Sequence, residues 1–227
     1  MFPDKKDPWG GLKIGVATYT LRSLDLDSTL RTLKRLGIQW ISVKDVHLPR
    51  KTNLAERQAI VGRFREAGVT LVSCGNVGLP ADEAGIRDAF VYAKEIGVGT
   101  MVCAPKPESF PILDAMVKEF DIRLAIHNHG PEDKVFPTPQ SAYEAAKRYD
   151  KRIGLCIDVG HTARAGVDPA KAIRELRDRV YDIHIKDVAE ASVRFQPVEI
   201  GRGVLDIPAI LDSLRSIRFQ GVVGIEY

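Results

Sequence analysis

The sequence has little of several features that mark specialised classes of protein. Only three of its 227 residues are cysteine, and Cys74, Cys103 and Cys156 lie far apart inside apolar stretches. Such spacing forms neither a disulfide framework nor a zinc knuckle, so we interpret them as buried free thiols of a reducing compartment. The longest apolar runs have about six to eight residues and are too short to cross a bilayer.

An excess of charge of one sign is also lacking. Lysine and arginine total 33 against 30 acidic residues, a formal net charge of +3. This balance gives no basis for binding nucleic acid or a membrane surface. Residues 1–8 are polar and resemble no signal peptide, so we expect a cytoplasmic protein; an exported parent whose leader has been removed is the alternative.

Apolar runs and amphipathic helical stretches alternate along the chain from residue 12 onward. We predict strands over residues 12–18, 38–43, 69–74, 100–103, 123–127, 153–158, 180–186 and 221–227. We predict helices over residues 27–36, 54–67, 82–96, 109–120 and 207–217, and two more that begin at Pro139 and Pro169.

This alternation predicts an α/β fold built from βαβ units with a parallel sheet. Eight units favour one (β/α)8 TIM-barrel domain over residues 1–227. A doubly wound open sheet is the alternative, but no glycine-rich phosphate loop follows the first strand. The helix that should follow the eighth strand is missing, so we expect either that the sequence has been cut short or that an oligomer partner or the N-terminal segment covers that gap.

The placement of the histidines predicts a functional site. The chain has five, and we expect each at or just beyond the end of a strand and none on a helix: His47, His127, His129, His161 and His184. Catalytic groups of (β/α)8 barrels lie at the C-terminal ends of the strands. The site is therefore expected at that end of the barrel.

Side-chain alternation directs a set of polar groups into the barrel. In the last four strands, polar residues share a face with small ones and bulky aliphatic residues occupy the other face; because an eight-stranded barrel is narrow, the small face is the interior. The converging residues are His127, Asp158, His184 and Glu226. They suit one divalent ion, Mn²⁺, Zn²⁺, Co²⁺ or Fe²⁺, with Mg²⁺ disfavoured. A hydrogen-bonded network without metal is the alternative.

Further polar residues near strand ends are candidates for contacts with the substrate. We assign this role to Lys44, His47, His129, His161, Lys186, Glu199 and Arg202. A solvated loop is the competing interpretation for Lys44 and His47. The glycines around Arg202 permit close backbone approach, so Glu199 or Arg202 could reach the site.

These residues lie in motifs that resemble the xylose isomerase-like TIM barrels, the sugar phosphate isomerase/epimerase family of the AP endonuclease 2 superfamily. The motifs are residues 126–132 (IHNHGPE), 157–161 (IDVGH), 182–187 (DIHIKD), 199–203 (EIGRG) and 224–226 (GIE). The resemblance implies one divalent metal held by His127, Asp158, His184 and Glu226. The chain departs from the family at His127, where a glutamate is usual. Family epimerases use two metal-bound glutamates as their acid/base pair, so that symmetric pair is broken here.

We therefore expect a metal-dependent isomerase or epimerase of a sugar or keto-sugar that works through an enediolate. Glu226 is the expected base, with His129 or Lys186 as the partner acid. One alternative is β-elimination from a 3-keto-glycoside, which begins with the same proton abstraction; another is a non-catalytic sugar- or metal-binding barrel. Endonuclease chemistry is disfavoured by the low charge and single ligand set. The expected partner is a small sugar, with neither nucleic acid nor membrane, and a homo-oligomer is left open.

Overall fold

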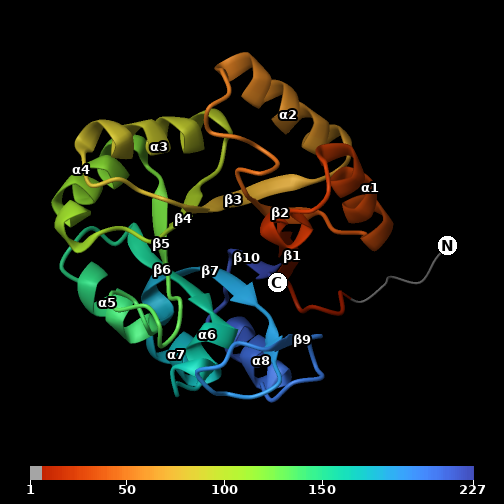
Figure 1. Cartoon of the computed structure of the whole chain (residues 1–227), viewed down its shortest axis with the longest axis vertical. Coiled ribbons are helices and arrows are strands. Elements are labelled where there is room, and N and C mark those ends of the chain that lie inside the picture. The colour runs from red at the N-terminus through yellow and green to blue at the C-terminus, as the bar shows by residue number, and fades with distance from the viewer. Residues whose placement is uncertain (1–6) are drawn as a thin grey trace.

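The computed structural model describes residues 7–227, and its central element is a closed ring of eight strands (Figure 1). These strands are β1 (Lys13–Ala17), β2 (Trp40–Val43), β3 (Thr70–Val77), β4 (Thr100–Cys103), β5 (Arg123–His127), β6 (Ile153–Asp158), β7 (Val180–Ile185) and β10 (Val222–Ile225). Neighbours in the ring run parallel, and β1 closes it by pairing with both β2 and β10. The predicted (β/α)8 barrel is confirmed.

Helices connect successive strands and surround the ring (Figure 1). They are α1 (Leu26–Leu36), α2 (Leu54–Glu66), α3 (Glu83–Glu95), α4 (Phe110–Phe120), α5 (Pro139–Ala146), α6 (Val159–Arg164), α7 (Pro169–Glu175) and α8 (Ile207–Ser216). Seven of them begin after a residue whose side chain accepts a backbone N–H of the first turn: Asp25, Asn53, Asp82, Thr138, Asp158, Asp168 and Asp206. Each cap of this kind stabilises the fold by about 1 kcal/mol. No helix within residues 7–227 is long and apolar enough to cross a membrane.

The hydrophobic core has an outer and an inner part. Leu155 and Ile157 of β6 belong to the large cluster of aliphatic and aromatic side chains. Cys156, between them in the sequence, belongs instead to a small cluster with Val102 and Ala125. The two faces of β6 are therefore divided as the alternation predicts, with small residues on the face that also carries Asp158.

Three local features depart from the predicted elements. Strand β3 continues to Val77, beyond its predicted end at Cys74, with an irregular register and with Gly75 at a φ of 141°. Helix α6 begins directly after β6, because the Asp158 side chain caps it. After β7, β8 (Asp187–Val188) and β9 (Pro197–Val198) form a short antiparallel pair.

Candidate active site

Four side chains at one end of the ring bring their ligand atoms within 4.8 Å of one another. They are His127, Asp158, His184 and Glu226. Asp158 pairs in register with His184 across β6 and β7, and the Glu226 backbone N–H donates to the Ile185 carbonyl. The convergence expected from side-chain alternation thus appears in the geometry. His127, Asp158 and His184 are 0–3% exposed.

Lys186 places a positive charge between the two carboxylates. Its Nζ lies 2.7 Å from Asp158 Oδ2 and 2.6 Å from Glu226 Oε2, and the residue is buried. Burial opposes the charged form of Lys186, but the two carboxylates outweigh it and raise its pKa. Burial likewise opposes ionisation of Asp158, and Lys186 holds its pKa well below the ordinary value. Lys186, Asp158 and Glu226 are therefore all charged in the folded protein.

The two imidazoles of the set have unsatisfied nitrogens. Neither ring nitrogen of His127 or of His184 has a hydrogen-bond partner. His127 Nε2 lies 3.4 Å from Asp158 Oδ2, and His184 Nδ1 lies 3.5 Å from Glu226 Oε1. Burial lowers the pKa of His127 to about 3, so that ring is neutral and keeps a free lone pair. Burial also opposes protonation of His184, but the Glu226 carboxylate outweighs it and raises the pKa of this ring.

These side chains fit a divalent cation. A buried polar atom without a partner costs about 1–3 kcal/mol, and coordination would relieve that cost at both imidazoles. The adjacent carboxylates supply negative charge, and the Lys186 ammonium already occupies a position between them. Imidazole and carboxylate together suit Zn²⁺, Mn²⁺, Co²⁺ or Fe²⁺ better than Mg²⁺.

A cavity of about 270 Å³ adjoins this set and gives it access to solvent. Its lining comes from residues at the C-terminal ends of β1, β2, β3, β5, β6 and β10 or just beyond them: Tyr19, Lys44, Asn76, His127, His129, His161 and Glu226. The structure therefore brings Lys44, His129 and His161 to the same cavity as two of the candidate metal ligands. A volume of this size accommodates a small polar molecule such as a monosaccharide.

Two hydrogen bonds orient His129 on the cavity wall. Its Nδ1 lies 3.2 Å from Asp133 Oδ2, and its Nε2 lies 3.2 Å from the Asn76 side-chain amide nitrogen. The carboxylate only accepts and the amide nitrogen only donates, which assigns the proton to Nδ1. Asn76 was not predicted as a site residue, because the predicted strand ended at Cys74. An extension of β3 by two residues would have placed it at the site.

His161 lies on helix α6, so the expectation that no histidine is helical is wrong. Its backbone N–H donates to Asp158 Oδ1 over 2.8 Å, and this helix cap explains the position. The ring Nδ1 accepts a hydrogen bond of 2.9 Å from Arg164. The ring also stacks on Phe195, with 5.5 Å between the ring centres. Phe195 is a second residue that the sequence did not indicate, because the intervening loop shows no periodic pattern.

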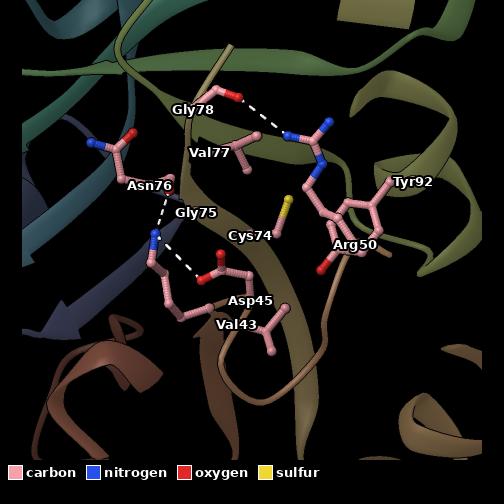
Figure 2. A pocket seen from close by; sticks show the side chains of 10 residues that line it. Val43, Asp45, Arg50, Cys74, Gly75, Asn76, Val77, Gly78 and Tyr92 are labelled. Atoms are coloured by element: carbon pink, nitrogen blue, oxygen red, sulfur yellow. Dashed lines mark hydrogen bonds and ion pairs between the residues drawn. The ribbon is translucent and has the colours of Figure 1, made fainter. Parts of the chain in front are cut away.

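A smaller cavity of about 80 Å³ shares Lys44 and Asn76 with the first (Figure 2). Lys44 Nζ donates to the Asn76 carbonyl over 2.6 Å and lies 3.6 Å from Asp45. Arg50 donates to the Gly78 carbonyl across the same cavity (Figure 2). Burial raises the pKa of Cys74, which also lines it, to about 12, so this thiol is neutral.

Three predicted contact residues lie away from the cavity of the histidines. His47 is buried, with Nε2 at 2.9 Å from Thr29 Oγ1 and 3.1 Å from the Leu24 carbonyl. Glu199 and Arg202 are exposed and do not line that cavity.

The motif that contains Glu199 and Arg202 has a structural explanation. The Asp187 carboxylate accepts backbone N–H groups from Gly201, Gly203 and Leu205. A Cβ at Gly203 would lie 2.2 Å from Asp187 Oδ1. The glycines thus allow the loop to wrap around Asp187, and this packing accounts for the glycines of the motif.

Comparison with known proteins identifies the class of this barrel. Residues 30–227 match the family described as xylose isomerase-like TIM barrel, and the chain belongs to that family. The rhizopine catabolism protein MocC of Rhizobium meliloti is 27% identical over 123 residues, which are 48% of this chain and 37% of MocC. The matched stretch spans about a third of the curated relatives.

Solved structures share the fold over nearly the whole chain. The 3-keto-D-glucoside 4-epimerase YcjR of E. coli superposes with a TM-score of 0.75 at 19% identity, covering 95% of this chain and 91% of YcjR. An IOLI protein with a bound zinc atom gives a TM-score of 0.77 at 19% identity, covering 95% and 88%. These likenesses establish the barrel fold.

Proposed function

We propose that this protein is a divalent-metal-dependent enzyme that isomerises or epimerises a sugar or keto-sugar through an enediolate. The observation that carries the proposal is the convergence of His127, Asp158, His184 and Glu226 beside an open cavity, with the imidazole nitrogens unpartnered. The similarity in fold to a protein named a keto-glucoside epimerase and to one with a bound zinc atom supports it.

Metal binding is assigned to the four converging residues. When bound, a divalent ion would polarise a substrate carbonyl and acidify the adjacent C–H. Lys44 at the cavity wall is placed to donate a hydrogen bond to a substrate hydroxyl or carbonyl. The nearby Arg164 orients His161, whose ring forms another part of the wall.

Glu226 is the proposed base. Its carboxylate lines the cavity, while Asp158 is fully buried beneath it. Burial opposes ionisation of Glu226, but His184 and Lys186 outweigh it and lower its pKa, so the carboxylate is ionised. A carboxylate with a low pKa is a weak base, and it therefore requires a substrate C–H that is already acidified.

His129 and Lys186 are the proposed partner acids. His129 lines the cavity, where Asp133 and Asn76 hold its ring. Lys186 carries a proton 2.6 Å from Glu226 and can stabilise negative charge that develops on the substrate oxygen. Return of the proton to the neighbouring carbon gives isomerisation, and return to the opposite face of the same carbon gives epimerisation.

Elimination from a 3-keto-glycoside is a second candidate function, and one observation favours it. Among residues 7–227, Glu226 is the only carboxylate that lines the cavity of the histidines. A single base can remove the proton adjacent to the keto group while the substituent on the next carbon departs. This outcome requires no second base on the opposite face.

Proton exchange tests the proposal. Keto-sugars incubated with the protein in ²H₂O are expected to incorporate deuterium next to the carbonyl, and a chelator should abolish this exchange. Glu226→Gln should slow it by at least about 100-fold, as is typical for loss of a general base. Glu144→Gln, at an exposed residue, is the matched control.

Product analysis by NMR separates the candidates. A rearranged or inverted sugar supports the isomerase or epimerase, and release of the substituent with an unsaturated product supports elimination. Sugar binding without exchange across the panel would indicate a non-catalytic barrel and contradict both.

A further inference from the structure

Cys156 lies at the base of the proposed metal site. It pairs in register with His127 across β5 and β6. On β6 it comes two residues before Asp158, which pairs with His184 across β6 and β7. His127, Cys156 and His184 bring a sulfur and two ring nitrogens within 4.8 Å of one another. All three residues are almost completely buried.

The two imidazoles beside the sulfur make no hydrogen bonds. Both nitrogens of His127 and both nitrogens of His184 lack a hydrogen bond. The Cys156 sulfur makes one long contact, 3.9 Å to Asp182 Oδ1. A thiol is a weak donor, so little is lost when this contact breaks.

The Lys186 ammonium makes the Cys156 sulfur more important as a ligand for a cation. Its ammonium pairs with both Asp158 and Glu226, so a cation that approaches these carboxylates must compete with a positive charge already present. A cation drawn toward the two imidazoles and the Cys156 sulfur would compete less with that ammonium than one held by the carboxylates alone. A thiolate there would also add the negative charge that Lys186 removes from the carboxylates.

We propose that Cys156 is a ligand of the metal, which makes this a mixed sulfur, nitrogen and oxygen site selective for a thiophilic ion such as Zn²⁺. Binding forms a metal–sulfur bond and releases the thiol proton to solvent, without any change of oxidation state. Soft thiolate ligands favour zinc, while Mg²⁺ and Mn²⁺ prefer oxygen. The inference rests on the proposed metal dependence, but a metal site without sulfur would leave the proposed function intact.

X-ray absorption at the zinc edge tests the assignment directly. The zinc-loaded protein is expected to show a sulfur neighbour at about 2.3 Å in addition to nitrogen and oxygen at about 2.0–2.2 Å. Cys156→Ser should lose the sulfur signal. Cys103→Ser, at another fully buried cysteine outside the group, should retain it.

Chelator competition provides the second measurement. Cys156→Ser should weaken zinc binding by at least about tenfold while its affinity for Mn²⁺ changes little. Zinc bound through nitrogen and oxygen alone in the unsubstituted protein would overturn the inference and leave the proposed function standing. Failure of that protein to bind zinc or any other divalent ion would overturn both. The spectrum of the unsubstituted protein decides even where the serine variant does not fold.

Discussion

Lys186→Met tests how the buried charges at the site are balanced. The ammonium is the cation that neutralises Asp158 and Glu226, at 2.7 Å and 2.6 Å. Methionine has a similar length but no charge, so in the metal-free variant the two carboxylates repel each other in a buried setting. Removing one partner of a buried ion pair destabilises a protein by about 3–5 kcal/mol.

This loss translates into a measurable shift in melting temperature. A chain of this size changes its Tm by about 2–4 °C per kcal/mol, so metal-free Lys186→Met should melt roughly 6–20 °C lower. Zinc should then stabilise the variant more than the unsubstituted protein, because the ion no longer competes with an ammonium and binding adds stability by mass action.

Thermal unfolding followed by circular dichroism, with chelator and with zinc, gives both numbers. Lys171→Met is the matched control, since Lys171 forms an exposed pair with Glu175 at 3.8 Å and its loss should cost about 0–1 kcal/mol. If metal-free Lys186→Met melted at the same temperature as the Lys171→Met control, the proposed neutralisation of the two carboxylates by Lys186 would be refuted. An equal zinc shift in the variant and the unsubstituted protein would refute the competition.

Two further substitutions test which histidines belong to the proposed metal site. Burial holds the pKa of folded His127 at about 3, whereas the unfolded ring takes up a proton near 6.5; this ring therefore removes stability as the pH falls from 6.5 toward 3, by up to about 1.4 kcal/mol per unit. Urea unfolding at several pH values should show a shallower acid loss in metal-free His127→Gln, and equal slopes would contradict the assignment. His47→Ala leaves the Thr29 hydroxyl without its buried partner and should cost about 1–3 kcal/mol. Chelator competition should find zinc affinity unchanged, and a tenfold loss would place His47 at the site after all.

Hydrophobic alternation predicts the barrel well, because it depends only on which face of its own strand each side chain occupies. Leu155 and Ile157 pack outward and Cys156 inward, as the alternation along β6 requires. The same parity places Asp158 and His184 at one end of the ring, since parallel strands in a closed barrel leave little freedom of register. The family resemblance is confirmed over residues 30–227.

Parity does not predict contacts that depend on loops or on long flexible side chains. It places Lys186 on the inner face, but the pairing of its ammonium with Glu226 depends on where β10 closes the ring. It also misses α6, because a single aspartate both ends a strand and caps a helix. The loop that carries Arg202 is held by hydrogen bonds from Gly201 and Gly203 to Asp187, and spacing along the sequence does not reveal that packing.

Anomalous diffraction at the zinc edge, from crystals of the zinc-loaded protein, measures the central feature of this account. The account predicts one strong peak within bonding distance of His127 and His184, beside Asp158 and Glu226, at about one ion per chain. No peak at this position, or zinc bound only elsewhere on the barrel, would contradict it.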